Sequence, residues 1–263
     1  MIICADDYGM SDDVDRAILE LCALKHLSAV SCMVALERCG NDALKPLLEH
    51  QAHVDIGLHF CIADETLPSL ENARRNLPAF GAVLRQSLLG QIRAEQVRLQ
   101  VSDQYDLFLK KCGRPPDFID GHLHAHQLPG VREELLEFVA SLPASGRPYI
   151  RNTCEPLRNL WKHRLPWVKA AFIGRFGARM LTELRALGVP TNDGFAGIYD
   201  FQNYRRYTDY FPRFAACLQK TNGILVVHPG HNENWRLGEF TFLRDASFAS
   251  GTPNRFQREK LLT

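Results

Sequence analysis

Short apolar runs alternate with helix-length amphipathic segments along most of the chain. Between the runs, apolar side chains recur at helical spacing, which predicts helices over residues 11–26, 41–51, 91–112, 131–142, 175–187 and 208–220. Residues 64–88 show neither pattern and predict irregular structure. The apolar runs predict buried strands at Met1–Ala5, Ala29–Leu36, Val54–Leu58, Asp117–Ile119, Pro148–Arg151 and Ile224–Val227.

This alternation of strands and helices predicts an α/β fold with a mostly parallel sheet. Half a dozen strands in 263 residues suit a (β/α) barrel-like domain, whether complete, distorted or incomplete in its closure. An open, doubly wound sheet is the alternative. No Gly-x-Gly-x-x-Gly or Walker A sequence follows a predicted strand, which disfavours a nucleotide-binding version. We expect a single catalytic domain over residues 1–263, with insertions near 64–88 and 155–182.

Composition and charge exclude some classes of function but do not identify one. Lys plus Arg number 31 and Asp plus Glu number 30, so no global basic field favours nucleic acid as a partner. No apolar run approaches the ~20 residues of a transmembrane helix, and no signal peptide is predicted at the first residues. The eight cysteines contain no Cys-x-x-Cys pair, so we expect reduced thiols and a cytoplasmic location.

Polar side chains follow four of the predicted strands at the point where each strand ends. They lie in Asp6-Asp7-Tyr8-Gly9, in Gly57-Leu58-His59, in the segment from Asp120 to His126, and in His228-Pro229-Gly230-His231. In a parallel α/β fold the carboxyl ends of the strands gather on one face, where such folds place active sites. The sequence therefore predicts that two carboxylates and several imidazoles converge.

Two imidazoles and one carboxylate form a ligand set typical of catalytic zinc and similar divalent ions. A second carboxylate that does not bind the metal can accept a proton from water. Taken singly, Asp6-Asp7 before a glycine is often a turn or helix cap, and a lone histidine such as His59 is usually structural. His122, His124 and His126 would share one face if their segment were extended. The coincidence at four strand ends favours a metal-dependent hydrolase.

The same motifs resemble those of the YdjC-like carbohydrate deacetylases, which include chitooligosaccharide and hopanoid-associated (HpnK-type) members. The resemblance covers most of the chain, and it implies a (β/α) barrel-like fold similar to that of the NodB-type polysaccharide deacetylases. A tyrosine, Tyr8, stands where the family usually has phenylalanine. The motifs that carry the resemblance are Ala5-Asp6-Asp7-Tyr8-Gly9, Ile56-Gly57-Leu58-His59-Phe60, Asp120-Gly121-His122-Leu123-His124-Ala125-His126-Gln127-Leu128-Pro129 and Val227-His228-Pro229-Gly230.

The resemblance implies a role for each matched residue. Asp7, His59 and His122 would bind one divalent metal ion. Asp6 would be the general base and His228 the general acid in removing the N-acetyl group of an amino sugar as acetate. Two imidazoles favour Zn²⁺, Mn²⁺ or Co²⁺ as the bound ion, with Zn²⁺ preferred, while the family is also associated with Mg²⁺.

Further residues have less defined roles. His126 would line the sugar pocket or act as an alternative ligand, and the role of His124 stays open. Arg151, at the end of its strand, would orient Asp6 or hold substrate, and Tyr8 is grouped with the substrate-binding residues.

One stretch departs from the even charge balance. Residues 156–182 hold six cations and no acid, with Trp161 and Trp167 among them. A solvated basic face is the ordinary interpretation. The alternative is a lid or docking surface for an anionic partner, such as a nucleotide- or lipid-linked sugar or a membrane surface.

Two other functions compete with deacetylation. One is another metal-dependent hydrolase of the phosphoesterase or amidohydrolase type, and the other is a metal-dependent sugar-binding protein without catalysis. The sequence leaves open whether the sugar is free, nucleotide-linked or lipid-linked, and whether the protein is a homodimer.

Overall fold

Seven strands form one parallel sheet in the computed structural model of the protein, which describes residues 1–39, 42–73, 75–218, 222–245 and 253–257. Their order across the sheet is β5-β4-β3-β2-β1-β7-β6. The strands are β1 (Ile2–Tyr8), β2 (Ala29–Cys32), β3 (Asp55–Phe60), β4 (Phe118–Gly121), β5 (Tyr149–Ile150), β6 (Gly194–Ala196) and β7 (Gly223–Val227).

The two edges of this sheet approach each other. Ile150 of β5 forms a parallel bridge with Thr191, which comes shortly before β6. The Ile150 N–H donates a hydrogen bond of 2.9 Å to the carbonyl oxygen of Pro190. The sheet therefore curls into a distorted (β/α) barrel rather than lying open, as expected from the sequence.

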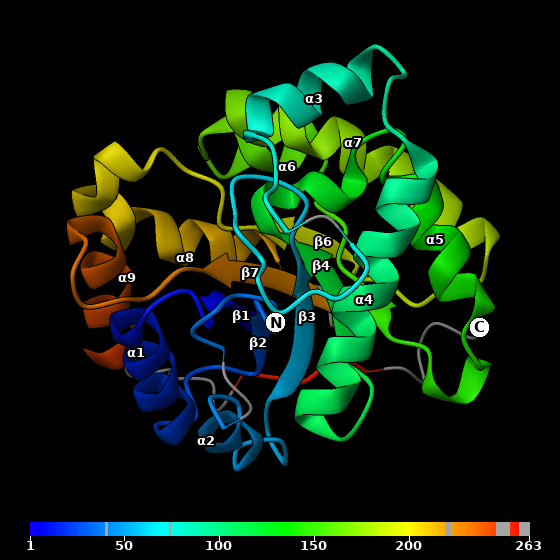
Figure 1. Cartoon of the computed structure of the whole chain (residues 1–263). Helices are drawn as coiled ribbons and strands as arrows, with labels where there is room; N and C mark the ends of the chain where they lie inside the picture. Colours follow the sequence, from blue (N-terminus) through cyan, green and yellow to red (C-terminus); the bar gives the residue numbers. More distant parts are fainter. Residues whose placement is uncertain (40–41, 74, 219–221, 246–252, 258–263) are drawn as a thin grey trace.

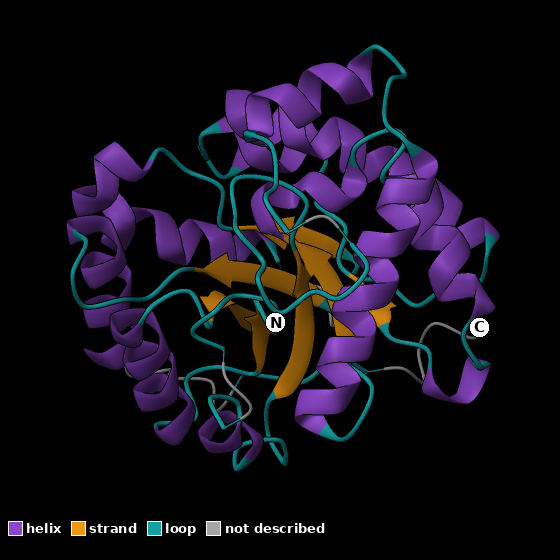
Figure 2. Cartoon of the chain, in the orientation of Figure 1, coloured by secondary structure: helices purple, strands orange, loops and turns teal. Residues whose placement is uncertain are grey.

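Helices surround the strands (Figures 1 and 2). The helix α1 packs against β1, α4 against β3 and α8 against β6. The helices are α1 (Asp12–Ala23), α2 (Lys45–Leu48), α3 (Phe80–Leu88), α4 (Ala94–Cys112), α5 (Arg132–Ser141), α6 (Leu157–Lys162), α7 (Trp167–Ala186), α8 (Tyr207–Cys217) and α9 (Asn234–Asp245). None of these described helices combines the length and apolar character that crossing a bilayer requires.

Close packing between β3 and β4 sets the spacing of two strands that carry site residues. Gly57 of β3 lies against the ring of Phe118 in β4, and a Cβ atom on Gly57 would stand 2.4 Å from that ring. The Phe118 ring in turn stacks on Tyr149 with centroids 5.1 Å apart. Only glycine leaves room for this ring, so the glycine holds β3 and β4 at their observed distance.

Some predicted elements have other bounds in the structure, and some elements of the structure were not predicted. The helix expected from residue 175 begins at Trp167 and follows a short α6, because exposed apolar side chains at its start obscure a one-sided pattern. The irregular stretch 64–88 contains α3. Neither β6 nor α9 was predicted. The three residues of β6 leave almost no periodic signal, and α9 buries the charged Arg236 and Glu239 beside Phe240 and Leu243, which breaks the apolar pattern. Residues 41 and 219–220 of two predicted helices lie outside the described residues.

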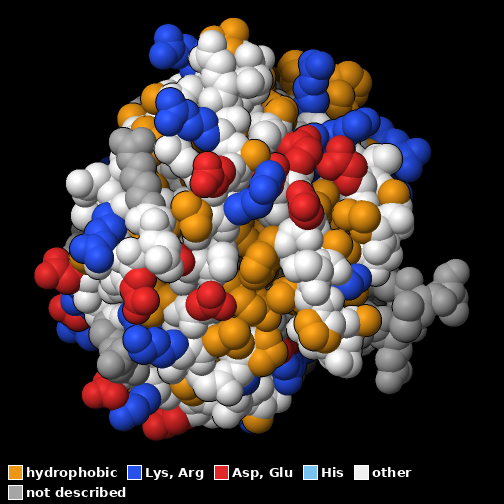
Figure 3. All heavy atoms as spheres, turned by 45° about the vertical axis from the view of Figure 1, so that its right-hand side comes forward, with side chains coloured by type: hydrophobic (Ala, Val, Ile, Leu, Met, Phe, Trp, Pro, Cys, Tyr) orange, Lys and Arg blue, Asp and Glu red, His pale blue; other side chains and the backbone are white. Residues whose placement is uncertain are grey.

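All eight cysteines are free thiols, as predicted. Charged side chains of both signs are mixed on the surface. Figure 3 shows a face on which Lys and Arg side chains lie among Asp and Glu side chains, with hydrophobic side chains between them.

Candidate active site

The end of β1 directs two adjacent carboxylates to different partners. Asp7 has a left-handed backbone, with φ of 71°, and the β1–β2 register shifts between Ala5 and Tyr8. This irregularity turns Asp6 toward Arg151 and Asp7 toward two histidines. The two neighbouring side chains therefore diverge, and each carboxylate has a separate environment.

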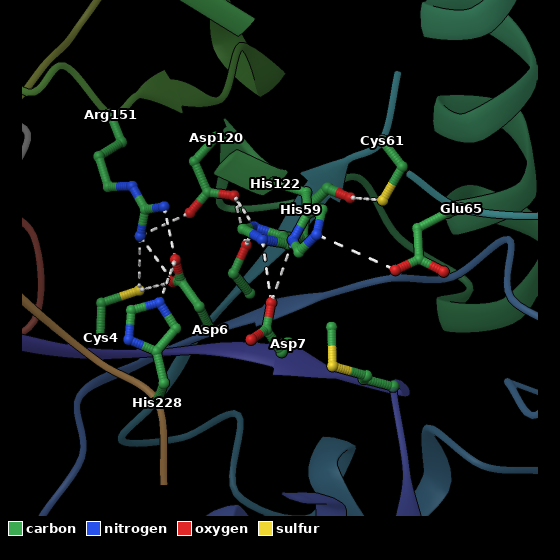
Figure 4. Close-up of polar contacts among 12 residues, drawn as sticks. Cys4, Asp6, Asp7, His59, Cys61, Glu65, Asp120, His122, Arg151 and His228 are labelled. Carbon is green, nitrogen blue, oxygen red and sulfur yellow. Dashed lines mark hydrogen bonds and ion pairs between the residues drawn. The ribbon is translucent and has the colours of Figure 1, made fainter. Parts of the chain in front are cut away.

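Asp7, His59 and His122 form a compact group of potential metal ligands. The Asp7 Oδ1 atom lies 3.4 Å from Nε2 of His59 and 3.3 Å from Nδ1 of His122. One ligand atom from each residue lies within 4.8 Å of the others, and Figure 4 shows the three side chains pointing toward one another. Two imidazoles and one carboxylate fit a divalent ion with an open coordination position.

Asp120 orients the histidine of β3. Its Oδ1 lies 2.7 Å from Nδ1 of His59 and also accepts a hydrogen bond from the Ser31 hydroxyl. A carboxylate only accepts, so Nδ1 of His59 carries a proton and Nε2 is the nitrogen that faces Asp7. Burial lowers the pKa of His59, but the charges of Asp120 and Asp6 outweigh it and raise this pKa to about 10. The acid-rich site thus favours a positive charge at this position.

A fully buried arginine holds the other carboxylate. Arg151 donates to both oxygens of Asp6, with Nη1–Oδ1 and Nη2–Oδ2 distances of 2.7 and 2.8 Å, and also pairs with Asp120 Oδ2 at 2.9 Å. Burial raises the pKa of Asp6, but the charge of Arg151 outweighs it and holds this pKa below its usual range. Cys4, Asp6 and Asp120 are also close enough to hold a metal, yet the Arg151 guanidinium already pairs with all three. Asp6 therefore stays ionised and does not join the ligand group.

His228 follows β7 and faces Asp6 from the other side. Its Nε2 lies 3.9 Å from Asp6 Oδ2. Burial lowers the pKa of His228 to about 4, although both neighbouring carboxylates oppose the shift. The backbone N–H of His228 donates a 2.6 Å hydrogen bond to Glu239, which also accepts from the Tyr199 hydroxyl at 2.6 Å. Burial raises the pKa of Glu239 to about 7.

A second arginine holds the carboxylate of Asp7. Arg236 of α9 donates from Nη2 to Asp7 Oδ2 at 2.8 Å, which leaves Asp7 Oδ1 facing the two histidines. Arg236 and Glu239 lie one turn apart on α9, so this helix fixes both Asp7 and the His228 backbone. Sequence reasoning missed both residues, because the helix itself was not predicted.

These groups lie at a cavity of about 430 Å³. The polar part includes Asp6, Asp7, His59, His122 and His228, together with His124, Lys169 and Arg236. The walls are largely apolar and aromatic, and they include Phe80, Leu123, Phe172, Ile173, Phe201 and Trp235. The arrangement therefore places a potential metal-ligand group, a separate carboxylate and an imidazole at one cavity with largely apolar walls.

The segment from His122 to His126 is not extended, and the expectation that its three rings share a face was wrong. It forms a 3₁₀ turn, with left-handed φ values of 54° at Leu123 and 57° at His124. The turn separates the rings: His122 faces Asp7, while His124 packs edge-on against Phe195.

Three further predicted residues are buried. His126 Nε2 lies 2.8 Å from the carbonyl oxygen of Arg151, and its ring packs where a side chain on Gly121 would lie. The Tyr8 hydroxyl donates to the carbonyl oxygen of Ala43. The lining of the 430 Å³ cavity, over its described residues, includes neither of these side chains nor Arg151. A part for them in substrate binding stays a prediction.

The model of the YdjC-like protein family matches residues 1–251. The chain is 28% identical over 188 residues to a chitooligosaccharide deacetylase of Serratia marcescens, covering 70% of this chain and 71% of that protein. It is 26% identical over 139 residues to the chitooligosaccharide deacetylase of Proteus mirabilis, covering 52% and 54%. For the carbohydrate deacetylase of Mus musculus the identity is 29% over 163 residues, covering 59% and 51%. The chain thus spans only about half the length of two of these relatives.

Among solved structures, a candidate cellobiose-phosphate cleavage protein from Enterococcus faecalis superposes with a TM-score of 0.61 at 17% identity. The superposition covers 92% of this chain and 89% of the other. At this identity the likeness supports the fold alone.

Proposed function

This chain belongs to the YdjC-like protein family, and on that premise we propose that it is a metal-dependent carbohydrate deacetylase. It would hydrolyse the amide C–N bond of an N-acetylated amino sugar and release acetate. The observation that carries the proposal is the placement of Asp7, His59 and His122 as one ligand group beside a separate, ionised Asp6.

Asp7, His59 and His122 would hold the metal ion. Two imidazoles favour Zn²⁺ over harder ions. A divalent ion there would polarise the acetyl carbonyl and lower the pKa of water toward ~7. The chain supplies the geometry for this: Asp120 fixes the ring of His59, and Arg236 fixes the carboxylate of Asp7.

Asp6 would accept the proton of the attacking water. Its two hydrogen bonds from Arg151 hold the carboxylate in one orientation and keep it ionised at neutral pH. Arg151 is thus proposed as a positioning residue for the base. Loss of a general base typically lowers the rate by ~10²–10⁴-fold.

His228 would deliver a proton to the departing amine. With a pKa lowered to about 4, the imidazole is neutral at pH 7 and must gain its proton during the reaction. The nearest acid at that stage is Asp6, which has just received the proton of the water, and its Oδ2 lies 3.9 Å from Nε2 of His228. We therefore propose that the proton passes from Asp6 to His228 and from there to the nitrogen.

The sugar would lie between the aromatic walls of the cavity. Phe201 and Trp235 stack on each other with centroids 4.1 Å apart, and the Phe201 ring contacts His228 edge-on. Both rings line the cavity, so together they form an apolar wall for a pyranose ring close to the proposed acid.

Acetate release from a panel of N-acetylated amino sugars, with and without a chelator, tests the proposal. We expect chelator-sensitive release that Asp6→Asn lowers by about 10²–10⁴-fold while stoichiometric metal is retained. Asp7→Ala should lose metal as well as activity. The matched control is Asp106→Asn on α4, an exposed carboxylate far from the ligand group, which should leave both unchanged.

Two results would reject this function. Metal and sugar binding without acetate release would indicate a sugar-binding protein. Release of phosphate from phosphorylated sugars, in place of acetate, would indicate a phosphoesterase. Full activity of Asp6→Asn would reject the base assignment alone.

A further inference from the structure

Helices α6 and α7 expose large apolar side chains at the rim of the cavity. Trp161, Trp167, Val168 and Phe172 are 59%, 47%, 68% and 51% exposed. The two tryptophan rings meet edge to face with centroids 6.0 Å apart, which joins the apolar side chains of α6 to those of α7. Phe172 is both exposed and part of the cavity lining, so the apolar surface extends to the cavity itself. Contiguous exposed apolar surface of this kind usually marks a contact site.

Uncompensated positive charge accompanies this surface, which we call the α6–α7 surface. Residues 156–182 carry no acid. Over the described residues, only one of the six cations pairs with a carboxylate, Arg179 with Glu183 at 2.7 Å. Glu183 also pairs with Arg132, so it does not neutralise the surface. The six cations are Arg158, Lys162, Arg164, Lys169, Arg175 and Arg179.

Four exposed side chains of α7 form one stripe. Val168, Phe172, Arg175 and Arg179 follow one another at spacings of four, three and four residues, which places them on one face of the helix. The buried residues Gly177, Met180 and Leu184 lie on the opposite face. The stripe is therefore apolar near the cavity and cationic farther along the helix.

We propose that the α6–α7 surface docks onto an anionic lipid bilayer. Tryptophan and phenylalanine side chains favour the boundary between headgroups and acyl chains, and unpaired Lys and Arg attract anionic headgroups. A nucleic acid would use the cations but would leave Val168 and Phe172 in water. A protein partner would have to place an acidic surface directly beside an apolar one, whereas an anionic bilayer supplies both at every position.

Docking in this way would bring the cavity to the bilayer surface. Lys169 lies at the boundary of the two regions: its Nζ is 5.0 Å from the centroid of the Phe201 ring, and it also lines the cavity. The consequence for catalysis rests on the proposed function: the deacetylase would act on amino sugars held at a membrane surface. The docking itself does not depend on catalysis.

Vesicle co-sedimentation of the full chain tests the docking without any substrate. We expect binding to vesicles of equal parts phosphatidylglycerol and phosphatidylcholine at least about tenfold tighter than to phosphatidylcholine alone. The triple variant Arg158→Gln/Lys162→Gln/Arg175→Gln should weaken binding to the mixed vesicles by roughly 100-fold. Val168→Ser should weaken it by about tenfold through lost apolar burial.

A matched control removes the same number of charges elsewhere. Lys25, Arg85 and Lys110 are exposed and lie on or beside other helices, and the triple variant to glutamine should bind vesicles like the unchanged protein. All variants are checked for unchanged folding by circular dichroism. Three results would overturn the proposal. They are equal binding to both vesicle types, an equal loss of vesicle binding in the control triple variant, and binding to DNA or an anionic protein in place of vesicles.

Acetate release from a soluble N-acetylated oligosaccharide separates the two proposals. The α6–α7 triple variant should keep this activity while losing vesicle binding. Vesicle binding without any acetate release would reject the proposed function and leave the docking intact.

Discussion

Replacing Asp120 with asparagine removes one negative charge from the centre of the site and almost nothing else. Asp120 is fully buried, and its two oxygens are shared among Nδ1 of His59 at 2.7 Å, Nη1 of Arg151 at 2.9 Å and the Ser31 hydroxyl. Asparagine has the same shape and keeps one oxygen that can accept from His59. The substitution therefore tests the charge that supports the proposed metal ligand.

The structure sets the expected magnitude. Loss of a carboxylate paired with a metal-bound histidine typically lowers metal affinity by 10- to 100-fold. Because asparagine preserves the orientation of the His59 ring, we expect the lower end, about tenfold or ~1.4 kcal/mol. Asp120→Ala, which removes both charge and acceptor, should reach about 100-fold. Arg151 keeps its two bonds to Asp6, so the metal-free protein should lose only ~1–3 kcal/mol of unfolding free energy.

Zinc affinity is measured by competition with a fluorescent chelator, and unfolding free energy by urea titration. Ser31→Ala is the matched control, because the Ser31 hydroxyl contacts both Asp120 and His59 but carries no charge. It should change zinc affinity by less than about threefold. Unchanged zinc affinity in Asp120→Asn, or an equal loss in both variants, would refute the argument that the charge of Asp120 supports His59.

Three further changes test other parts of the molecule. Arg151→Lys cannot hold both oxygens of Asp6, so turnover should fall about tenfold with metal content unchanged; equal turnover would contradict its positioning role. Burial raises the pKa of Glu239 to about 7, so its contribution to unfolding free energy should fall by roughly 3 kcal/mol as pH rises from 4.5 to 7, and urea titrations of Glu239→Gln should lack this slope. Gly57→Ala forces a methyl group against the Phe118 ring and should cost about 1–3 kcal/mol or more of unfolding free energy; a melting temperature like that of the unchanged protein would contradict the packing argument.

The general fold and the centre of the site could be predicted from the sequence. The alternation of strands and helices indicated a parallel sheet, and parallel strands bring their carboxyl ends to one face. Asp6, Asp7, His59, His122 and His228 stand directly at such ends, so their convergence required only the direction of the strands. The resemblance to the YdjC-like family then gave each of them an expected role.

The residues that support the site could be predicted only in part. Arg151 was expected to orient Asp6 or hold substrate, but its simultaneous pairing with Asp6 and Asp120 depends on how far the sheet curls, which no local pattern encodes. Arg236 and Glu239 lie on α9, which packs against the strand ends. This packing brings Arg236 to Asp7, more than 200 positions away, and Glu239 to His228, 11 positions away.

The segment after β4 shows that sequence pattern can also mispredict side-chain placement within a few residues. Its alternating histidines satisfied the pattern of an extended strand, yet left-handed backbone at Leu123 and His124 turns the chain and gives each ring different neighbours. The sequence by itself determined which chemical groups stand at the strand ends, because the local hydrophobic pattern places the strands and their alternation with helices makes them parallel. Only the tertiary structure decided how those groups are paired, oriented and charged, because burial and ion pairing arise between elements distant in the chain.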